Sequence, residues 1–401
     1  MKVIKDSAIY LFGELVSKSI PFLLLPYLSR KLGVEGFGEL SYYQTFLALF
    51  AIFIGLSQDG AVARYFYRYG KRSLDLVVTT GYAYTITIGA LGLIACWVAK
   101  SEIMFYLVLS SIFQVFLVVQ LSIRQCQKQA LPYTLIQLGS AITNAVFTVL
   151  MLEIYETALV EKRILAILFS NILIFVFSYL LFLSKYKTTK RAFNLLQYKK
   201  ALMFIVAFGF PLLFHIGSGY LKNYADRLLV YEVYGSTLLG LYSMGINIAL
   251  ILSTLITAIN KATIPYYFEG IKNRSITKES ACKFTLLSFV VVPIPVVLCL
   301  LFPSETFSWL LGEGFEGSKY YIAVFLLAKS LSIPYIFLAN YLFFYGKTRS
   351  IAICSVFSVV VYVISLMILS TFGVEYIPFA TVISEIVILF PLYFMVKKET
   401  I

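Results

Sequence analysis

Apolar stretches of about 20 residues follow one another along nearly the whole chain. A helix of that length spans the hydrocarbon core of a bilayer. Hydrophobic residues make up 60% of the 401 residues and charged residues only 13%, whereas a water-soluble chain of this size needs more charge on its surface. The sequence therefore predicts an all-α polytopic membrane protein.

The apolar pattern predicts about 12 transmembrane helices. Their expected ranges are 8–28, 39–58, 76–99, 103–123, 131–152, 164–184, 201–221, 236–259, 281–302, 320–343, 350–371 and 375–396. The connections between them are short, at most about 20 residues, so no extramembrane domain is expected to hold a catalytic apparatus. Because the number of spans is even, both termini are expected on the same side of the membrane.

Lys and Arg residues indicate which side that is. About 23 of them fall in the termini and the even-numbered connections, against 8 in the other connections. Cytoplasmic loops carry such an excess of basic residues, so both termini are predicted to be cytoplasmic. The same bias accounts for most of the net charge of +13. Because no basic stripe with a nucleic-acid-binding motif accompanies it, no nucleic-acid partner is expected.

An internal repeat appears when the chain is compared with itself at an offset of 202 residues. Gly33–Ser41 then aligns with Gly235–Ser243, Tyr65-Phe66 with Tyr267-Phe268, and Arg72-Ser73 with Arg274-Ser275. Each copy holds six expected spans and has the same orientation. The repeat predicts two six-helix bundles, residues 1–200 and 201–401, related by a parallel pseudo-two-fold axis along the membrane normal.

Ionisable residues inside the expected spans, or near and just beyond the end of the seventh span, are the candidates for function, because charge in a bilayer is costly and usually serves a partner or a wet cavity. They are Glu14, Lys18, Lys222, Asp226, Arg227, Lys329 and Glu385. Local ion pairs, Glu14–Lys18 and Lys222–Asp226, are one interpretation; a polar cavity is the other. Arg30 and Lys329 have no acid nearby in sequence, which favours a cationic chamber for a phosphate or diphosphate group.

Other chemistries find little support in the sequence. The five cysteines show neither metal-ligand spacing nor a disulfide framework. The stretch Tyr341–Thr348 ends like a phosphate-binding loop, but it lacks the first glycine and follows an expected span. Catalytic residues, a metal site and a cofactor are therefore not expected.

The connection between the first two spans carries a family resemblance. Leu28-Ser29-Arg30-Lys31-Leu32-Gly33 followed by Gly36-Phe37-Gly38 resembles the SR-x-LG…FG signature of bacterial polysaccharide flippases. These are O-antigen and lipid-linked oligosaccharide translocases of the multidrug/oligosaccharidyl-lipid/polysaccharide exporter superfamily. Further matches run from Gly55-Leu56 to Ala63-Arg64-Tyr65, and from Asp226-Arg227 to Tyr242-Ser243. The resemblance covers essentially the whole chain.

The resemblance implies a V-shaped pair of bundles in the bacterial inner membrane. It implies alternating-access transfer of an undecaprenyl-diphosphate-linked oligosaccharide to the outer leaflet, driven by an H+ or Na+ gradient or the membrane potential. Membrane lipids and glycan polymerase machinery are the other implied partners. The expected substrate-binding residues are Lys18, Arg30, Arg64, Lys222, Arg227 and Lys329, and the expected ion-coupling residues are Glu14, Asp226 and Glu385.

Two alternatives stay open. A multidrug cation exporter of the same superfamily would favour acidic cavity residues, whereas the intramembrane charges without a sequence neighbour lean basic here. A membrane-embedded glycan polymerase or ligase would carry a large periplasmic loop, and the expected outward connections are short. The flippase is therefore the preferred hypothesis.

Overall fold

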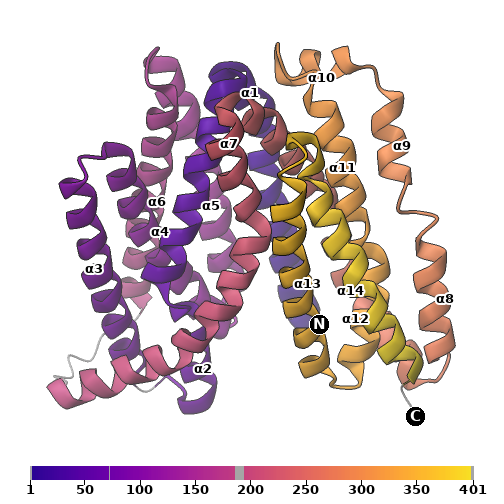
Figure 1. Ribbon diagram of the computed structural model, residues 1–401. Helices are drawn as coiled ribbons and strands as arrows, with labels where there is room; N and C mark the ends of the chain where they lie inside the picture. Colours follow the sequence, from indigo (N-terminus) through magenta and orange to yellow (C-terminus); the bar gives the residue numbers. More distant parts are fainter. Residues whose placement is uncertain (1, 72, 186–193, 399–401) are drawn as a thin grey trace. The chain divides into compact units, whose positions relative to one another are not determined.

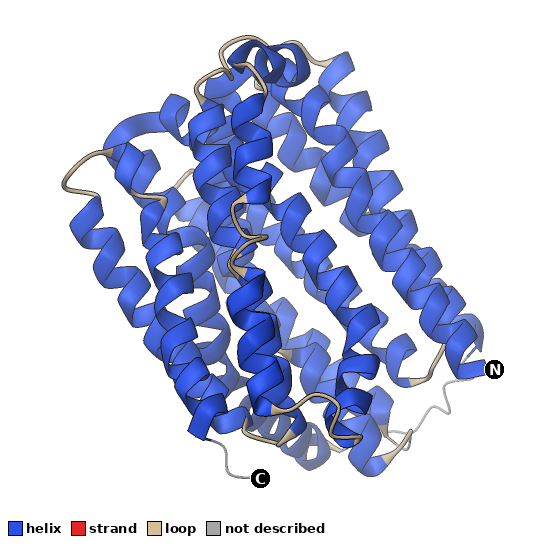
Figure 2. Cartoon of the chain, turned by 90° about the vertical axis from the view of Figure 1, so that its right-hand side faces the viewer, coloured by secondary structure: helices blue, strands red, loops and turns tan. Residues whose placement is uncertain are grey.

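The computed structural model describes residues 2–71, 73–185 and 194–398, so Arg72 of the proposed repeat lies outside the described residues. Within these ranges the chain is helical apart from short connections (Figures 1 and 2). The helices are α1 (Lys2–Gly55), α2 (Gln58–Tyr69), α3 (Leu74–Val98), α4 (Glu102–Cys126), α5 (Ala130–Ile154), α6 (Leu159–Lys185), α7 (Leu195–Lys272), α8 (Lys278–Ser288), α9 (Ile294–Leu301), α10 (Ser304–Leu311), α11 (Ser318–Ser330), α12 (Ser332–Phe344), α13 (Thr348–Leu369), the 3-10 turn η1 (Val374–Tyr376) and α14 (Phe379–Lys398).

Two long helices each contain a glycine in a non-helical conformation. In α1 this is Gly33 (φ 67°, ψ −179°), and in α7 it is Gly235 (φ 84°, ψ 176°). Glycine adopts positive φ without a Cβ clash, so each residue can end one helix and start the next. Each long helix therefore holds two of the expected spans. The described chain has nine helical segments long and apolar enough to cross a membrane, these two included.

The ninth expected span, 281–302, is interrupted rather than continuous. Helix α8 ends at Ser288 and α9 starts at Ile294, with a turn between them. Pro293 and Pro295 lie at this restart, and proline lacks the N–H that a continuous helix needs. A second break follows, because α9 and α10 are bent by 85° to each other. With this broken segment, the structure accounts for all twelve expected spans.

The chain divides into two compact units. Unit 1 comprises Met1–Leu24 and Tyr43–Tyr220, and unit 2 comprises Leu25–Tyr42 and Leu221–Ile401. In unit 1, α4 packs against α3, α5 and α6, and in unit 2, α14 packs against α11, α12 and α13. The expected boundary of the bundles at residues 200/201 stays a prediction. The first turn, residues 25–42, packs with the second half of the chain.

The two copies of the repeat contact each other within unit 2. A methyl group on Gly38 would overlap the backbone oxygen of Ser236, and one on Gly240 would overlap that of Val34. Under the 202-residue offset, positions 34 and 38 correspond to 236 and 240, so each contact is the counterpart of the other. A self-complementary contact of this kind is the mark of two-fold symmetry. Together with the matching breaks at Gly33 and Gly235, it confirms the repeat at this turn.

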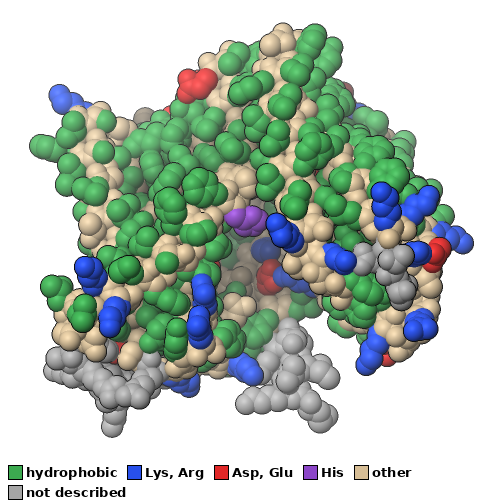
Figure 3. Space-filling model, turned by 60° about the horizontal axis from the view of Figure 1, so that its bottom comes forward, with side chains coloured by type: hydrophobic (Ala, Val, Ile, Leu, Met, Phe, Trp, Pro, Cys, Tyr) green, Lys and Arg blue, Asp and Glu red, His purple; other side chains and the backbone are tan. Residues whose placement is uncertain are grey.

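Many large hydrophobic side chains lie on the surface of the described chain. Leu23, Trp97, Phe214 and Leu301 are among many large hydrophobic side chains that lie exposed. Figure 3 shows hydrophobic side chains over much of the face in view, with Lys and Arg side chains gathered in its lower part. A soluble protein rarely exposes this much apolar surface, so the surface fits a lipid environment.

We predict that Gly38→Ala and Gly240→Ala each lower the melting temperature of the detergent-purified protein. The added methyl must push a backbone apart, and overpacking of this kind costs about 1–3 kcal/mol. The control is Gly217→Ala in α7, where a Cβ meets nothing within 4 Å, so helix propensity alone should leave stability equal or higher. Equal stability of all three variants would contradict the close packing.

Candidate functional site in the second unit

Charged residues from three helices gather in unit 2. Lys222, Asp226 and Arg227 lie on α7, Lys329 on α11 and Glu385 on α14. Lys329 interacts electrostatically with all four of the others, although they lie up to 163 residues from one another in sequence. We call these five residues the charged cluster. It unites five of the nine residues predicted from the sequence.

Asp226 is the buried carboxylate of the charged cluster, with only 3% of its surface exposed. The Tyr242 hydroxyl donates to its Oδ2 at 2.6 Å, and the backbone N–H of Arg227 donates to its Oδ1 at 2.9 Å. Buried charge is tolerated when it is paired and hydrogen-bonded. Tyr242, itself fully buried, therefore holds Asp226 in place.

Arg227 lies beside this carboxylate and is 6% exposed. Its guanidinium lies over the Tyr224 ring, 5.1 Å from the centroid. Its Nε has no hydrogen-bond partner. The arginine is therefore positioned by an aromatic face and retains one unused donor.

Lys222 does not pair with Asp226, so that predicted ion pair is wrong. Its ammonium lies 3.0 Å from Glu385 Oε1 and donates to Ser358 Oγ at 3.1 Å. The i,i+4 spacing on α7 permitted the Asp226 pair. The Tyr242 hydroxyl already donates to Asp226 Oδ2, and α14 supplies Glu385 as another carboxylate for Lys222.

Lys329 is the lysine of the charged cluster whose ammonium does not form an ion pair with any single acid of the described chain. Within the described residues it makes no ion pair shorter than 4.0 Å, and no hydrogen bond from its ammonium is present. The cluster has three basic and two acidic side chains, an excess of one positive charge when all are ionised. This arrangement is suited to an anion.

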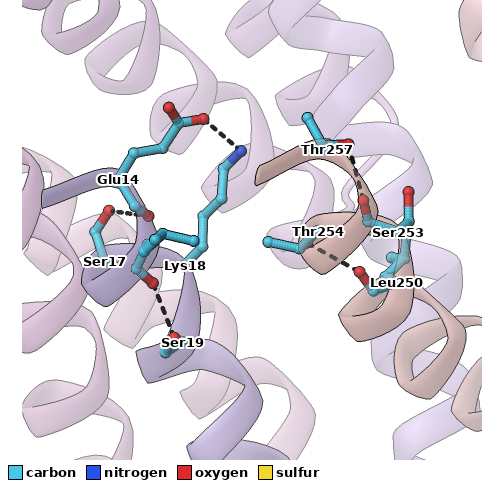
Figure 4. Close-up of polar contacts among 9 residues, drawn as sticks. Glu14, Ser17, Lys18, Ser19, Leu250, Ser253, Thr254 and Thr257 are labelled. Carbon is cyan, nitrogen blue, oxygen red and sulfur yellow. Dashed lines mark hydrogen bonds and ion pairs between the residues drawn. The ribbon is translucent and has the colours of Figure 1, made fainter. Parts of the chain in front are cut away.

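The remaining predicted residues lie elsewhere. Lys18 forms the expected pair with Glu14 on α1, with 2.8 Å between Nζ and Oε1 (Figure 4). Arg64, in unit 1, lies over the rings of Phe204 and Phe208. Arg30 donates to the carbonyl oxygen of Trp309 near the end of α10. Their roles in substrate binding stay predictions.

Two buried arginines of unit 1 were not among the predicted site residues. Arg124 is 3% exposed and donates to the carbonyl oxygens of Gln120 and Ser178. Arg163 is 7% exposed and donates to Asn144 Oδ1 at 3.1 Å. Both fall in the connections between expected spans, Arg124 directly after span 103–123 and Arg163 directly before span 164–184. Gln120, a polar residue four positions before Arg124, was the available signal for the first.

We predict that Tyr242→Phe destabilises the protein by about 1–3 kcal/mol, because it leaves a buried carboxylate oxygen without its donor. Thermal unfolding in detergent measures the loss. Tyr376→Phe is the matched control, since that side chain is 50% exposed. If both variants melt at the same temperature as the wild type, the hydrogen bond from Tyr242 to Asp226 does not contribute to stability.

Known proteins of similar sequence identify the family of this chain. The model of the family described as "Polysaccharide biosynthesis protein" matches residues 3–271. A membrane protein of Haemophilus influenzae is 58% identical over 398 residues, which cover 99% of this chain and 98% of the relative. A second H. influenzae protein, named for the Lsg locus, is 54% identical over 398 residues and 99% of both chains.

Solved structures show the same fold at low sequence identity. An inward-facing MATE-family multidrug resistance transporter of the MOP superfamily superposes with a TM-score of 0.67 at 16% identity, covering 96% of this chain and 99% of the other. An outward-facing MATE-family structure gives 0.62 at 15% identity, covering 99% and 94%. This chain therefore belongs to the polysaccharide biosynthesis protein family and has the all-helical, multi-span membrane fold of the MATE transporters in the MOP superfamily, in which twelve spans form two bundles.

Proposed function

We propose that the protein is a flippase for undecaprenyl-diphosphate-linked oligosaccharide, such as an O-antigen repeat unit, in the bacterial cytoplasmic membrane. The observation that carries the proposal is the charged cluster, with its excess of positive charge and with Lys329 uncommitted. An intramembrane cation of this kind usually marks a substrate or ion pathway. The family match to polysaccharide biosynthesis proteins supports a glycan substrate.

The chemistry of the cluster fits a diphosphate. Phosphate oxygens accept charge-assisted hydrogen bonds from ammonium and guanidinium groups. Lys329 offers its ammonium, and Arg227 offers an Nε that is buried without a partner. Lys222 can add a third donor when it leaves Glu385. The polyprenyl tail would remain in lipid while the two bundles expose the head group to alternate sides.

Energy input would act through the carboxylates. Glu385 neutralises Lys222 across a 3.0 Å ion pair. Cation or proton binding at Glu385 would weaken that pair and release a positive charge toward the diphosphate. Asp226 and Glu14 are the other proposed ion-coupling groups, and they accept from Tyr242 and Lys18.

The charge balance disfavours the multidrug alternative. A cationic drug would meet three basic side chains and only two acidic ones. The solved multidrug transporters share 15–16% identity with this chain, and such a likeness concerns the fold. A glycan polymerase or ligase is disfavoured by the short connections between the described helices.

We predict that Lys329→Gln lowers surface glycan at least about ten-fold, the equivalent of one strong charge-assisted contact, while the protein level in the membrane stays normal. Immunoblots of the glycan and of the tagged protein measure both. Lys319→Gln is the matched control, because it removes a lysine from the start of the same helix, where Nζ donates to the Leu300 carbonyl. Lys329→Arg should retain display, since it keeps the charge. Full display by Lys329→Gln would refute the assignment of Lys329.

A further inference from the structure

The second span ends in a strained break that the proposed function does not explain. Between α1 and α2, Leu56 (φ 45°) and Ser57 (φ 51°) both adopt left-handed backbone conformations. Positive φ is costly for residues other than glycine, and such strain gathers at functional sites. The break lies in unit 1, in the stretch from Gly55 to Tyr65.

The break leaves backbone oxygens outside the helical ladder. The carbonyl oxygen of Phe53 accepts from the Tyr84 hydroxyl at 3.2 Å, and that of Ile54 accepts from Thr85 Oγ1 at 3.4 Å. The carbonyl oxygen of Gly55, the last residue of α1, accepts no hydrogen bond from the described part of the chain. It is therefore available to a ligand.

A cavity of about 220 Å³ adjoins this break within unit 1. Its polar lining comes from Ser57, Gln58, Asp59 and Gln114, and Gly55 also lines it. Apolar residues complete the wall: Ala51, Ile52, Val115, Val118, Val119 and Ile216. At about 30 Å³ per water molecule, the volume has room for an ion with part of its hydration shell.

Several oxygen atoms of these side chains lack partners. Ser57 Oγ and the amide oxygens of Gln58 and Gln114 are buried without a hydrogen bond, and Gln58 as a residue is 2% exposed. Buried acceptors normally find a donor or a cation, because leaving one unsatisfied is costly. Among the described residues Asp59 forms no ion pair. Within the described residues, the cavity is thus lined by one exposed carboxylate without an ion-pair partner and by several buried neutral oxygens without hydrogen-bond partners.

We propose that this cavity binds a sodium ion. Oxygen ligands suit a hard cation, and broken helices of membrane transporters use freed carbonyls for this purpose. Asp59 would supply the charge, and the Gly55 carbonyl, the Ser57 hydroxyl and the Gln114 amide the neutral ligands. A proton on Asp59 would leave those neutral oxygens without a partner. The set of oxygen ligands therefore favours a metal cation over a proton.

Sodium at this position would connect two parts of unit 1. Gln114 lies on α4, whereas Gly55, Ser57 and Asp59 lie at the junction of α1 and α2. An ion shared between them would hold the strained break in one conformation. Its part in driving transport rests on the proposed function, but the binding of sodium does not.

The test uses the full-length protein in detergent without glycolipid. NaCl is titrated against choline chloride at constant ionic strength, and the melting temperature is recorded. A ligand that binds only the folded state raises the melting temperature as its concentration rises, so sodium should do so where choline and potassium do not. Asp59→Asn should abolish the sodium-dependent rise. Asp75→Asn, a first-turn aspartate of α3 outside the cavity, should retain it.

A second pair of variants covers the case in which Asp59→Asn fails to fold. Gln114→Leu and Ser57→Ala each remove one neutral ligand and should weaken the apparent sodium affinity by about ten-fold or more. The proposal is overturned if sodium does not specifically raise the melting temperature of the wild type, or if Asp59→Asn shows the same rise. It is also overturned if acidification without sodium produces the same rise. Because no glycolipid is present, none of these outcomes bears on the flippase proposal, which glycan display tests separately.

Discussion

The reciprocal contact of Gly38 and Gly240 is the constraint on which the arrangement of unit 2 depends. Each glycine lets a backbone approach where a single methyl group would overlap a carbonyl oxygen of the other copy. The contact requires the two turns to have the same shape, and Gly33 and Gly235 provide it by breaking their helices with nearly the same φ and ψ. Residues 25–42 thereby join unit 2, although the chain continues from them into unit 1. Any movement that separates the turn at residues 33–41 from the turn at residues 235–243 must break this glycine contact.

The symmetry makes the charged cluster more informative. Under the 202-residue offset, Asp226, Arg227 and Tyr242 correspond to Leu24, Leu25 and Leu40. The first copy thus keeps leucines where the second copy has a buried carboxylate, a buried guanidinium and the tyrosine that orients the carboxylate. Apolar packing serves the fold equally well at these positions, and burying charge costs free energy. The difference between the copies therefore favours a functional reason for the charges, in line with the proposed diphosphate site.

Much of the fold could be predicted from sequence, because the length of an apolar run and a repeated glycine motif are both visible in the order of residues alone. The ninth span was the exception, since Pro293 and Pro295 interrupt its apolar run. Residues of the site were found as charges inside or close to the expected spans, but their pairing was not: Lys222 binds Glu385 from α14, a contact that only tertiary structure reveals. Arg30 had looked unpaired for the same reason, since its acceptor is a carbonyl 279 residues away. The cavity at Leu56–Ser57 also escaped prediction, because a left-handed break at two residues other than glycine leaves no signal in the sequence.

The central claim is that this protein moves lipid-linked oligosaccharide from the cytoplasmic to the outer leaflet. The most direct measurement is the leaflet location of that lipid in a strain lacking the gene, determined by labelling of the sugar in right-side-out and inverted membrane vesicles. The account predicts that the labelled lipid accumulates in the cytoplasmic leaflet and that the restored gene returns it to the outer leaflet. An unchanged amount in the outer leaflet of the deletion strain, with no other flippase gene expressed, would contradict it.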